Sequence, residues 1–166
     1  AAVIRRAGAR SALGAQCELP GPVGERNLYA LHPRGRILLA PQTSDGLLHQ
    51  LGVTLATGNV AVIDTGCGLA RPALPTSVAA RVAWSGDWAA DGPFAAALVE
   101  GDAARILKLS QTIADLQGPL VPVHAASSDA LRDDLEAYCL DWLLEEVSTS
   151  INTTAAGGNA ALMGIG

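Results

Sequence analysis

The residues best suited to chemistry follow a short apolar run at 60–63 and include Asp64, a glycine-containing turn and Cys67. A glycine-rich turn after a buried strand can cradle a pyrophosphate, because backbone N–H groups and a helix N-terminus favour anions. The dinucleotide fingerprint lacks its third glycine, since Arg71 stands at that position. Asp64 would also repel phosphate unless it bound a ribose hydroxyl. We therefore favour the alternative, an ordinary turn.

Cysteines and histidines give no second candidate. A nucleophilic Cys67 would need a base or a helix N-terminus beside it. The spacings of the cysteines match neither a zinc nor a redox pattern, and the histidines lie in unrelated segments. These residues are Cys17, Cys67, Cys139, His32, His49 and His124. We expect Cys139 in the core, His49 on the polar side of its helix and His124 as a satisfied loop residue. The sequence thus predicts no catalytic residue and no metal site.

The composition of the chain argues against some classes of binding partner. The chain has 166 residues, a net charge of −5 and 4% aromatic residues, which argues against a nucleic-acid partner. We expect neither a signal peptide nor a membrane span, because no apolar run is long enough for one. The odd number of cysteines is typical of a reducing compartment. The only methionine is Met163, so we expect a piece of a longer, cytoplasmic polypeptide.

Alternating strand and helix patterns predict an α/β fold: a Rossmann-like, mostly parallel sheet with helices on both faces, plus a C-terminal strand or tail. The expected strands are residues 27–31, 36–40, 60–63, 81–84, 94–99 and 120–123. Expected helices begin near residues 1, 44, 76 and 103, and the longest runs from Ser127 or Ser128 to about Val147. Leu131, Tyr138 and Trp142 lie on the apolar stripe of that longest helix. We divide the chain into a lead-in helix or linker (1–19), a Rossmann domain (20–147) and a docking tail (148–166).

Residues 147–166 carry no charge and are mostly small, so they cannot build a core of their own. A strand is expected over 148–154, and small side chains with amide and hydroxyl donors suit docking against another surface. A plain edge strand with a loose end is the alternative. The residues that we expect to dock are Ser150, Asn152, Thr153, Thr154, Gly157, Gly158, Asn159, Leu162 and Met163.

Two pairs of stretches resemble known families. Residues 33–41 and 56–63, a strand and then a helix ending in Ala-Thr-Gly-Asn, resemble the cofactor domain of the aldehyde dehydrogenase superfamily. Residues 24–29 and 150–163 resemble the C-terminal region of the proline utilization A family. Members of that family oxidise proline to glutamate with a flavin domain and an NAD-dependent semialdehyde dehydrogenase domain. The resemblance therefore implies FAD and NAD in the parent protein and none in this piece.

The chain departs from active relatives at three places. Gln42 and Thr43 replace a Trp-Asn pair, Asp64 replaces a lysine, and Val99-Glu100-Gly101-Asp102 replaces Phe-Thr-Gly-Ser. The carboxylates of Asp64, Glu100 and Asp102 would repel a phosphate bound at these positions. The resemblance thus implies a non-catalytic C-terminal domain whose tail docks on the dehydrogenase domain of the same polypeptide and closes its active site or substrate channel. The alternatives are a reduced NAD-binding domain that contributes directly to pyrroline-5-carboxylate dehydrogenase activity, and a homodimer formed through the C-terminal strand.

Overall fold

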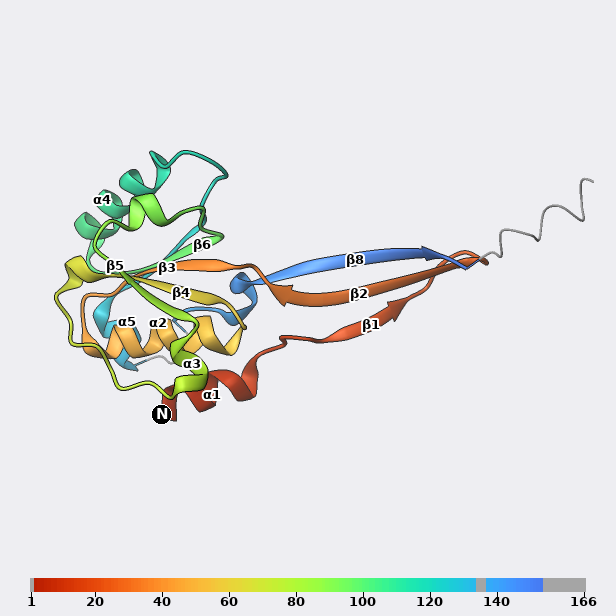
Figure 1. Ribbon diagram of the computed structural model, residues 1–166, viewed down its shortest axis with the longest axis horizontal. Helices are drawn as coiled ribbons and strands as arrows, with labels where there is room; N and C mark the ends of the chain where they lie inside the picture. The colour runs from red at the N-terminus through yellow and green to blue at the C-terminus, as the bar shows by residue number, and fades with distance from the viewer. Residues whose placement is uncertain (1, 134–136, 154–166) are drawn as a thin grey trace, which may run out of the picture.

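The computed structural model describes residues 2–133 and 137–153, and it divides them into a body and a projecting arm (Figure 1). The body holds a parallel sheet in the order β5-β4-β3-β6-β7. Its strands are β3 (Arg36–Ala40), β4 (Val60–Asp64), β5 (Val82–Ser85), β6 (Ala96–Glu100) and β7 (Val123–Ala126). This arrangement confirms the predicted α/β fold class.

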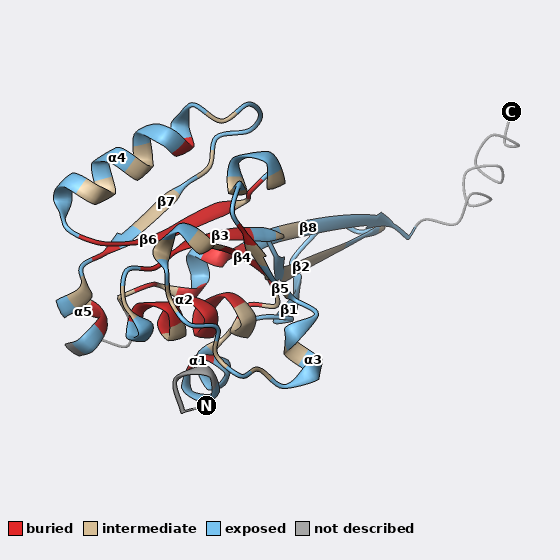
Figure 2. Ribbon diagram, turned by 60° about the vertical axis from the view of Figure 1, so that its left-hand side comes forward, coloured by how far each residue is buried: buried red, intermediate tan, exposed pale blue. Residues whose placement is uncertain are grey.

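The strands of this sheet are apolar because helices cover both of its faces. Ile37 and Leu39 of β3 pack into a core with α2, whereas Leu38 between them packs on the other face with Ile113 of α4. Figure 2 shows most of β3, β4 and β6 in the colour of buried residues, together with much of α2. The helices are α1 (Ala2–Arg10), α2 (Ser44–Ala56), α3 (Thr76–Ala79), α4 (Ala103–Ala114) and α5 (Ser128–Asp133), with 3-10 turns η1 (Thr65–Cys67), η2 (Trp88–Asp91) and η3 (Leu140–Leu143).

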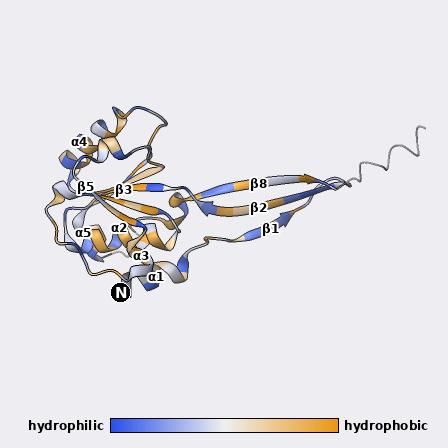
Figure 3. Cartoon of the chain, in the orientation of Figure 1, coloured by the Kyte–Doolittle hydropathy of each residue, from blue (hydrophilic) through white to orange (hydrophobic). Residues whose placement is uncertain are grey.

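The arm is a three-stranded antiparallel sheet in the order β1-β2-β8. Its strands are β1 (Gln16–Leu19), β2 (Glu25–Pro33) and β8 (Leu144–Asn152). The long β2–β8 pair runs without interruption from Glu25 opposite Asn152 to Pro33 opposite Leu144. Figure 3 shows apolar residues concentrated in the body and a mixed surface along the arm. Among the described residues, no helix is long and apolar enough to cross a bilayer.

The prediction of a long helix from Ser127 or Ser128 to about Val147 is wrong. α5 ends at Asp133, and beyond the gap at 134–136 the chain forms η3 and then β8. The strand pairs with all of β2, a distant partner that a local helical pattern cannot reveal. The expected strand at 148–154 exists but begins at Leu144, so the boundary that we placed before Ser148 falls within it.

Asn59 joins the body to the base of the arm and explains the Ala-Thr-Gly-Asn motif. Its side chain is fully buried. Oδ1 accepts from the backbone N–H of Gly35 at 2.7 Å, and Nδ2 donates to the carbonyl oxygen of Leu143 and to Oγ1 of Thr57, both at 2.8 Å. Gly58 before it has φ +71°, which only glycine adopts readily. The motif therefore ties the end of α2, the start of β3 and the chain just before β8 to one amide.

Replacing this amide should destabilise the fold. Asn59→Ala leaves the Gly35 N–H without its acceptor and removes the shorter of the two hydrogen bonds to the Leu143 carbonyl. We therefore expect a loss of about 3 kcal/mol in the free energy of unfolding. Denaturant unfolding followed by tryptophan fluorescence measures the loss. Gln111→Ala, which removes an exposed amide from α4, is the matched control and should change the stability by less than about 0.5 kcal/mol. Equal losses in the two variants would contradict the role assigned to Asn59.

Candidate functional site

The crevice at the carboxyl ends of β3 and β6 is the place where this fold class binds ligands. The chain runs from β3 toward β4 and β5 on one side and from β6 toward β7 on the other. Such a switch point leaves a crevice between the two strands, with the N-terminus of the following helix beside it. Here α2 follows β3 and α4 follows β6. A dinucleotide would place its pyrophosphate at one of these helix N-termini.

Glu100, the last residue of β6, fills this crevice with its own carboxylate. It is fully buried. Oε2 accepts from the backbone N–H groups of Gln42 at 2.6 Å and Thr43 at 2.9 Å, and Oε1 accepts from Oγ1 of Thr43 at 2.7 Å. Gly46, in the first turn of α2, lies so close that a Cβ there would overlap the carboxylate. The N-terminus of α2 thus already binds an anion supplied by the chain itself.

The charge on Glu100 is stabilised where it stands. Burial by itself would raise the pKa of this carboxyl group. The hydrogen bonds from the backbone of Gln42, the side chain and backbone of Thr43 and the side chain of Ser128 outweigh burial, and they lower the pKa below its ordinary value of 4.5. The positive end of the α2 dipole favours the same ionised form. Glu100 is therefore an anion at neutral pH.

The other two acidic positions also serve the fold locally. Asp102 caps α4, since its Oδ1 accepts from the backbone N–H of Arg105 at 2.8 Å. Arg105 reaches back across the crevice, where Nε donates to the carbonyl oxygen of Glu100 at 2.9 Å and a terminal nitrogen donates to that of Pro41 at 3.2 Å. Asp64 accepts from the N–H of Gly66 at 2.8 Å and caps η1. The glycine turn that we considered for a nucleotide is an ordinary 3-10 turn.

The histidines and cysteines do not assemble into a reactive cluster. Within residues 2–133 and 137–153, no group of three or more histidine, cysteine or acidic residues could hold a metal ion. His49 is buried rather than on a polar face, and Cys139 is half-buried just before η3 rather than on a helical stripe. His124 lies in β7 and stacks on Trp142 with ring centres 4.5 Å apart. Its Nε2 has no hydrogen-bond partner among the residues that the structure describes, so the expectation of a satisfied loop histidine is wrong. Burial and the charge of Arg34 lower the pKa of His124.

The predicted docking residues lie at the far end of the arm or outside the described residues. Ser150 and Asn152 belong to β8, opposite Asn27 and Glu25. The N–H of Thr153 donates to the carbonyl oxygen of Gly24 at 2.8 Å and closes the distal end of the arm. The remaining positions lie outside the described part of the chain; they are Thr154, Gly157, Gly158, Asn159, Leu162 and Met163. The arm therefore carries the start of the tail to its tip, away from the body (Figure 1).

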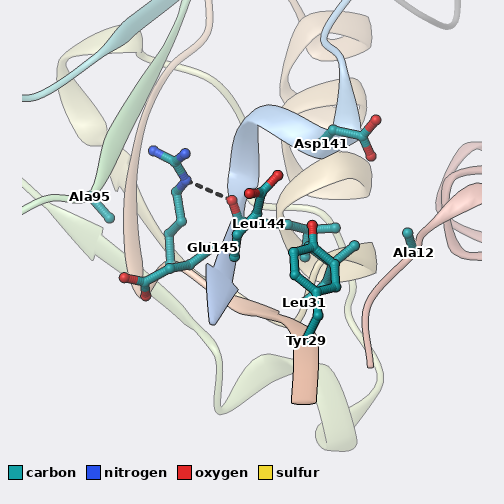
Figure 4. A pocket seen from close by; sticks show the side chains of 9 residues that line it. Ala12, Tyr29, Leu31, Ala95, Asp141, Leu144 and Glu145 are labelled. Atoms are coloured by element: carbon teal, nitrogen blue, oxygen red, sulfur yellow. Dashed lines mark hydrogen bonds between the residues drawn. The ribbon is translucent and has the colours of Figure 1, made fainter. Parts of the chain in front are cut away.

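A cavity of about 660 Å³ lies where the arm meets the body (Figure 4). Arg34 spans part of it, with Nε donating to the carbonyl oxygen of Leu144 at 2.9 Å. Burial raises the pKa of the Tyr29 phenol, and its hydrogen bond with Glu146 raises it further. The lining residues are Ala12, Tyr29, Leu31, Arg34, Ala95, Asp141, Leu144, Glu145 and Glu146. Sequence reasoning missed this cavity, because it assigned the last four of these residues to a helix.

Curated relatives of the chain are much longer proteins. No family model matches the chain. It is 63% identical over 164 residues to bifunctional protein PutA of Rhizobium meliloti, which covers 98% of this chain and 13% of that protein. It is 37% identical over 157 residues to PutA of Salmonella typhimurium, covering 92% of this chain and 11% of that protein. The chain thus spans between 11% and 13% of the length of these two relatives.

Solved structures agree on the fold. A crystal structure of bifunctional proline utilization A superposes with a TM-score of 0.54 at 19% identity, covering 75% of this chain and 15% of that chain. A substrate-bound Staphylococcus aureus AldH gives a TM-score of 0.50 at 17% identity, covering 76% of this chain and 31% of that chain. At these identities the likeness shows the fold alone. The curated relatives confirm the resemblance to the proline utilization A family, and the solved structures confirm the aldehyde-dehydrogenase-like fold.

Neutralising Glu100 should destabilise the body. Glu100→Gln keeps the size of the side chain but replaces one acceptor oxygen with an amide donor that faces N–H groups. We expect a loss of about 3 kcal/mol in the free energy of unfolding at pH 7, measured by denaturant titration. Glu25→Gln, the same chemical change at an exposed position of β2, should leave stability within about 0.5 kcal/mol.

The sign of the pH dependence follows from the lowered pKa. The stabilisation by ionised Glu100 is fully present above the ordinary pKa of 4.5 and is lost as the pH falls through the lowered value. The stability difference between the unsubstituted chain and Glu100→Gln should therefore be constant near neutrality and shrink in acid. A difference that grows on acidification would contradict the assigned direction.

Proposed function

We propose that this chain is the non-catalytic C-terminal domain of a bifunctional PutA enzyme. The proposal is supported by its homology, over nearly its whole length, to one segment of the PutA proteins. The parent would oxidise proline to glutamate in the bacterial cytoplasm, with FAD in one domain and NAD in a semialdehyde dehydrogenase domain. This segment would hold neither cofactor. Its partner would be the dehydrogenase domain of the same polypeptide.

The buried carboxylate of Glu100 carries the non-catalytic part of this proposal. A pyrophosphate at the N-terminus of α2 would have to displace an anion that already accepts from Gln42 and Thr43. It would also approach a second negative charge at hydrogen-bond distance, which is repulsive by several kcal/mol in a partly buried site. A Gly46 packed directly against the carboxylate leaves little room for both groups.

The alternative of a reduced NAD-binding domain makes a distinct prediction. If Glu100 occupies the anion site, calorimetric titration of the chain with NAD should show no association tighter than about 1 mM. The full-length enzyme, titrated in the same buffer, is the positive control. A dissociation constant in the micromolar range for the chain alone would overturn the non-catalytic assignment and favour the alternative.

The arm supports a docking role for the tail. It carries Thr153 to its distal end, and its residues are exposed or only half-buried everywhere beyond Leu144 (Figure 2). Ile151 and Leu19, near that end, are 41% and 40% exposed. A strand ribbon with so little buried surface is marginal alone and gains stability when another surface covers it. We propose that the tail, with Ser150, Asn152 and Thr153 at its root, covers the active site or channel of the dehydrogenase domain.

Truncation of the full-length enzyme tests the docking role. Ending the chain after Thr153 keeps all of β8, whereas ending it after Val147 also removes half of that strand. We expect the first truncation to lower semialdehyde dehydrogenase activity, or to release more intermediate into solution, while proline oxidation is unchanged. A variant in which residues 154–166 are replaced by a Gly/Ser segment of equal length controls for chain length. Kinetics equal to those of the intact enzyme for both reactions and for intermediate release would reject the docking role.

A further inference from the structure

His124 and Trp142 form a stacked pair where the arm leaves the body. His124 belongs to β7, the last strand in the order of the body sheet, and Trp142 belongs to η3, the turn that leads into β8. The centres of the two rings are 4.5 Å apart, and the ring planes are inclined by 16°. The pair is therefore a direct contact between the body and the turn from which the arm departs.

The turn that carries Trp142 is also held by Arg34. The backbone N–H of Arg34 donates to the carbonyl oxygen of Leu143 at 3.4 Å, and its Nε donates to that of Leu144 at 2.9 Å. Leu143 and Leu144 directly follow Trp142, so a shift of the indole ring moves the backbone that starts β8. The stack differs from these hydrogen bonds because one of its members, an imidazole, can change its charge near neutral pH.

The surroundings of His124 suit the neutral ring. Its Nε2 is buried and has no hydrogen-bond partner among the described residues, so a proton on that nitrogen would find no acceptor there. An imidazolium over an indole face gains cation–π attraction, which opposes this cost. Burial, followed by the charge of Arg34, nevertheless lowers the pKa of His124 below its ordinary value of 6.5. The folded chain therefore favours the uncharged imidazole.

Other charged groups near the stack do not offset Arg34. β7 contributes no charge, and the residue opposite His124 on β6 is a leucine. η3 carries Asp141, but the charge that acts on the imidazole is that of Arg34. In α5, Asp129 and Arg132 form an ion pair with each other at 3.2 Å. A positive charge on the imidazole would thus stand beside a second positive charge at the root of the arm.

We propose that the stack of His124 on Trp142 is a pH-sensitive latch, which holds η3 against β7 while the imidazole is neutral and loosens the root of β8 when it is protonated. The latch does not depend on the proposed function, because it concerns how the arm is held and not what the arm contacts. Its contribution is complete above the ordinary pKa of 6.5 and is lost as the pH falls from there through the lowered value. Glu100 changes charge only below its ordinary pKa of 4.5, so the two transitions are separate.

Nuclear magnetic resonance of the 166-residue chain tests the first step, the titration of the imidazole. The ring protons of the three histidines are followed against pH and assigned with His124→Gln and His32→Gln. We expect His124 to titrate below pH 6.5. A His124 ring that titrates at or above this value would overturn the proposal, and this measurement needs no variant to retain the fold.

Hydrogen exchange tests the second step, the loosening of the arm. We expect the protection factor of the Arg34 amide to fall at least about threefold between about pH 7.5 and about pH 5.5, with the midpoint of the His124 titration. His124→Phe keeps an aromatic ring on Trp142 without the charge and should abolish this fall. His32→Gln, which removes an exposed imidazole from β2, is the matched control and should leave it unchanged. A fall that persists in His124→Phe, disappears in His32→Gln or misses the midpoint would overturn the latch.

Discussion

The hydrogen bonds of the buried Glu100 carboxylate determine what the carboxyl end of the sheet can do. An ion in the interior is tolerated only when its lone pairs are satisfied, because desolvation otherwise costs several kcal/mol. Here the donors come from Gln42 and Thr43, which lead into α2. The carboxylate therefore joins the end of β6 to the start of the helix that follows β3. The switch point of the sheet is held together by a side chain where the fold class usually leaves room for a ligand.

The amino end of the same sheet has a different task. Asn59 donates to the carbonyl of Leu143, and Arg34 binds the carbonyls of Leu143 and Leu144 through its backbone and side chain. These bonds hold the last turn before β8 against the starts of β3 and β4. The direction of the arm is thereby set by buried and half-buried polar contacts of the body. The Glu100 carboxylate thus occupies the carboxyl end of the sheet, and the amino end supports the projecting arm.

The sequence was informative where local pattern and tertiary role agree. The bounds of β3 and β4 and the starts of α2 and α4 were predicted to within one residue, because buried parallel strands read as apolar runs and capped helices keep their apolar spacing. Glu100 was identified as a negative charge that would repel a phosphate. Its hydrogen bonds with Thr43 were not predicted, since they join residues distant in sequence. His49 was placed on a polar face, although α1 packs against α2 and Ala7 of α1 lies in the core. The pairing of β8 with β2 was not predicted either, because it also joins segments distant in sequence.

The two ends of the sheet use their polar groups differently. In an α/β fold, function resides in the site and not in the architecture. The donors that would recognise an anion at α2 are taken up inside this chain by Glu100. Along β8, by contrast, no strand among the described residues pairs with the outer edge. A strand edge recognises another extended chain and not a phosphate. In the described residues, the carboxyl end of the sheet is thus occupied by the chain's own carboxylate, and the other end carries an exposed antiparallel ribbon.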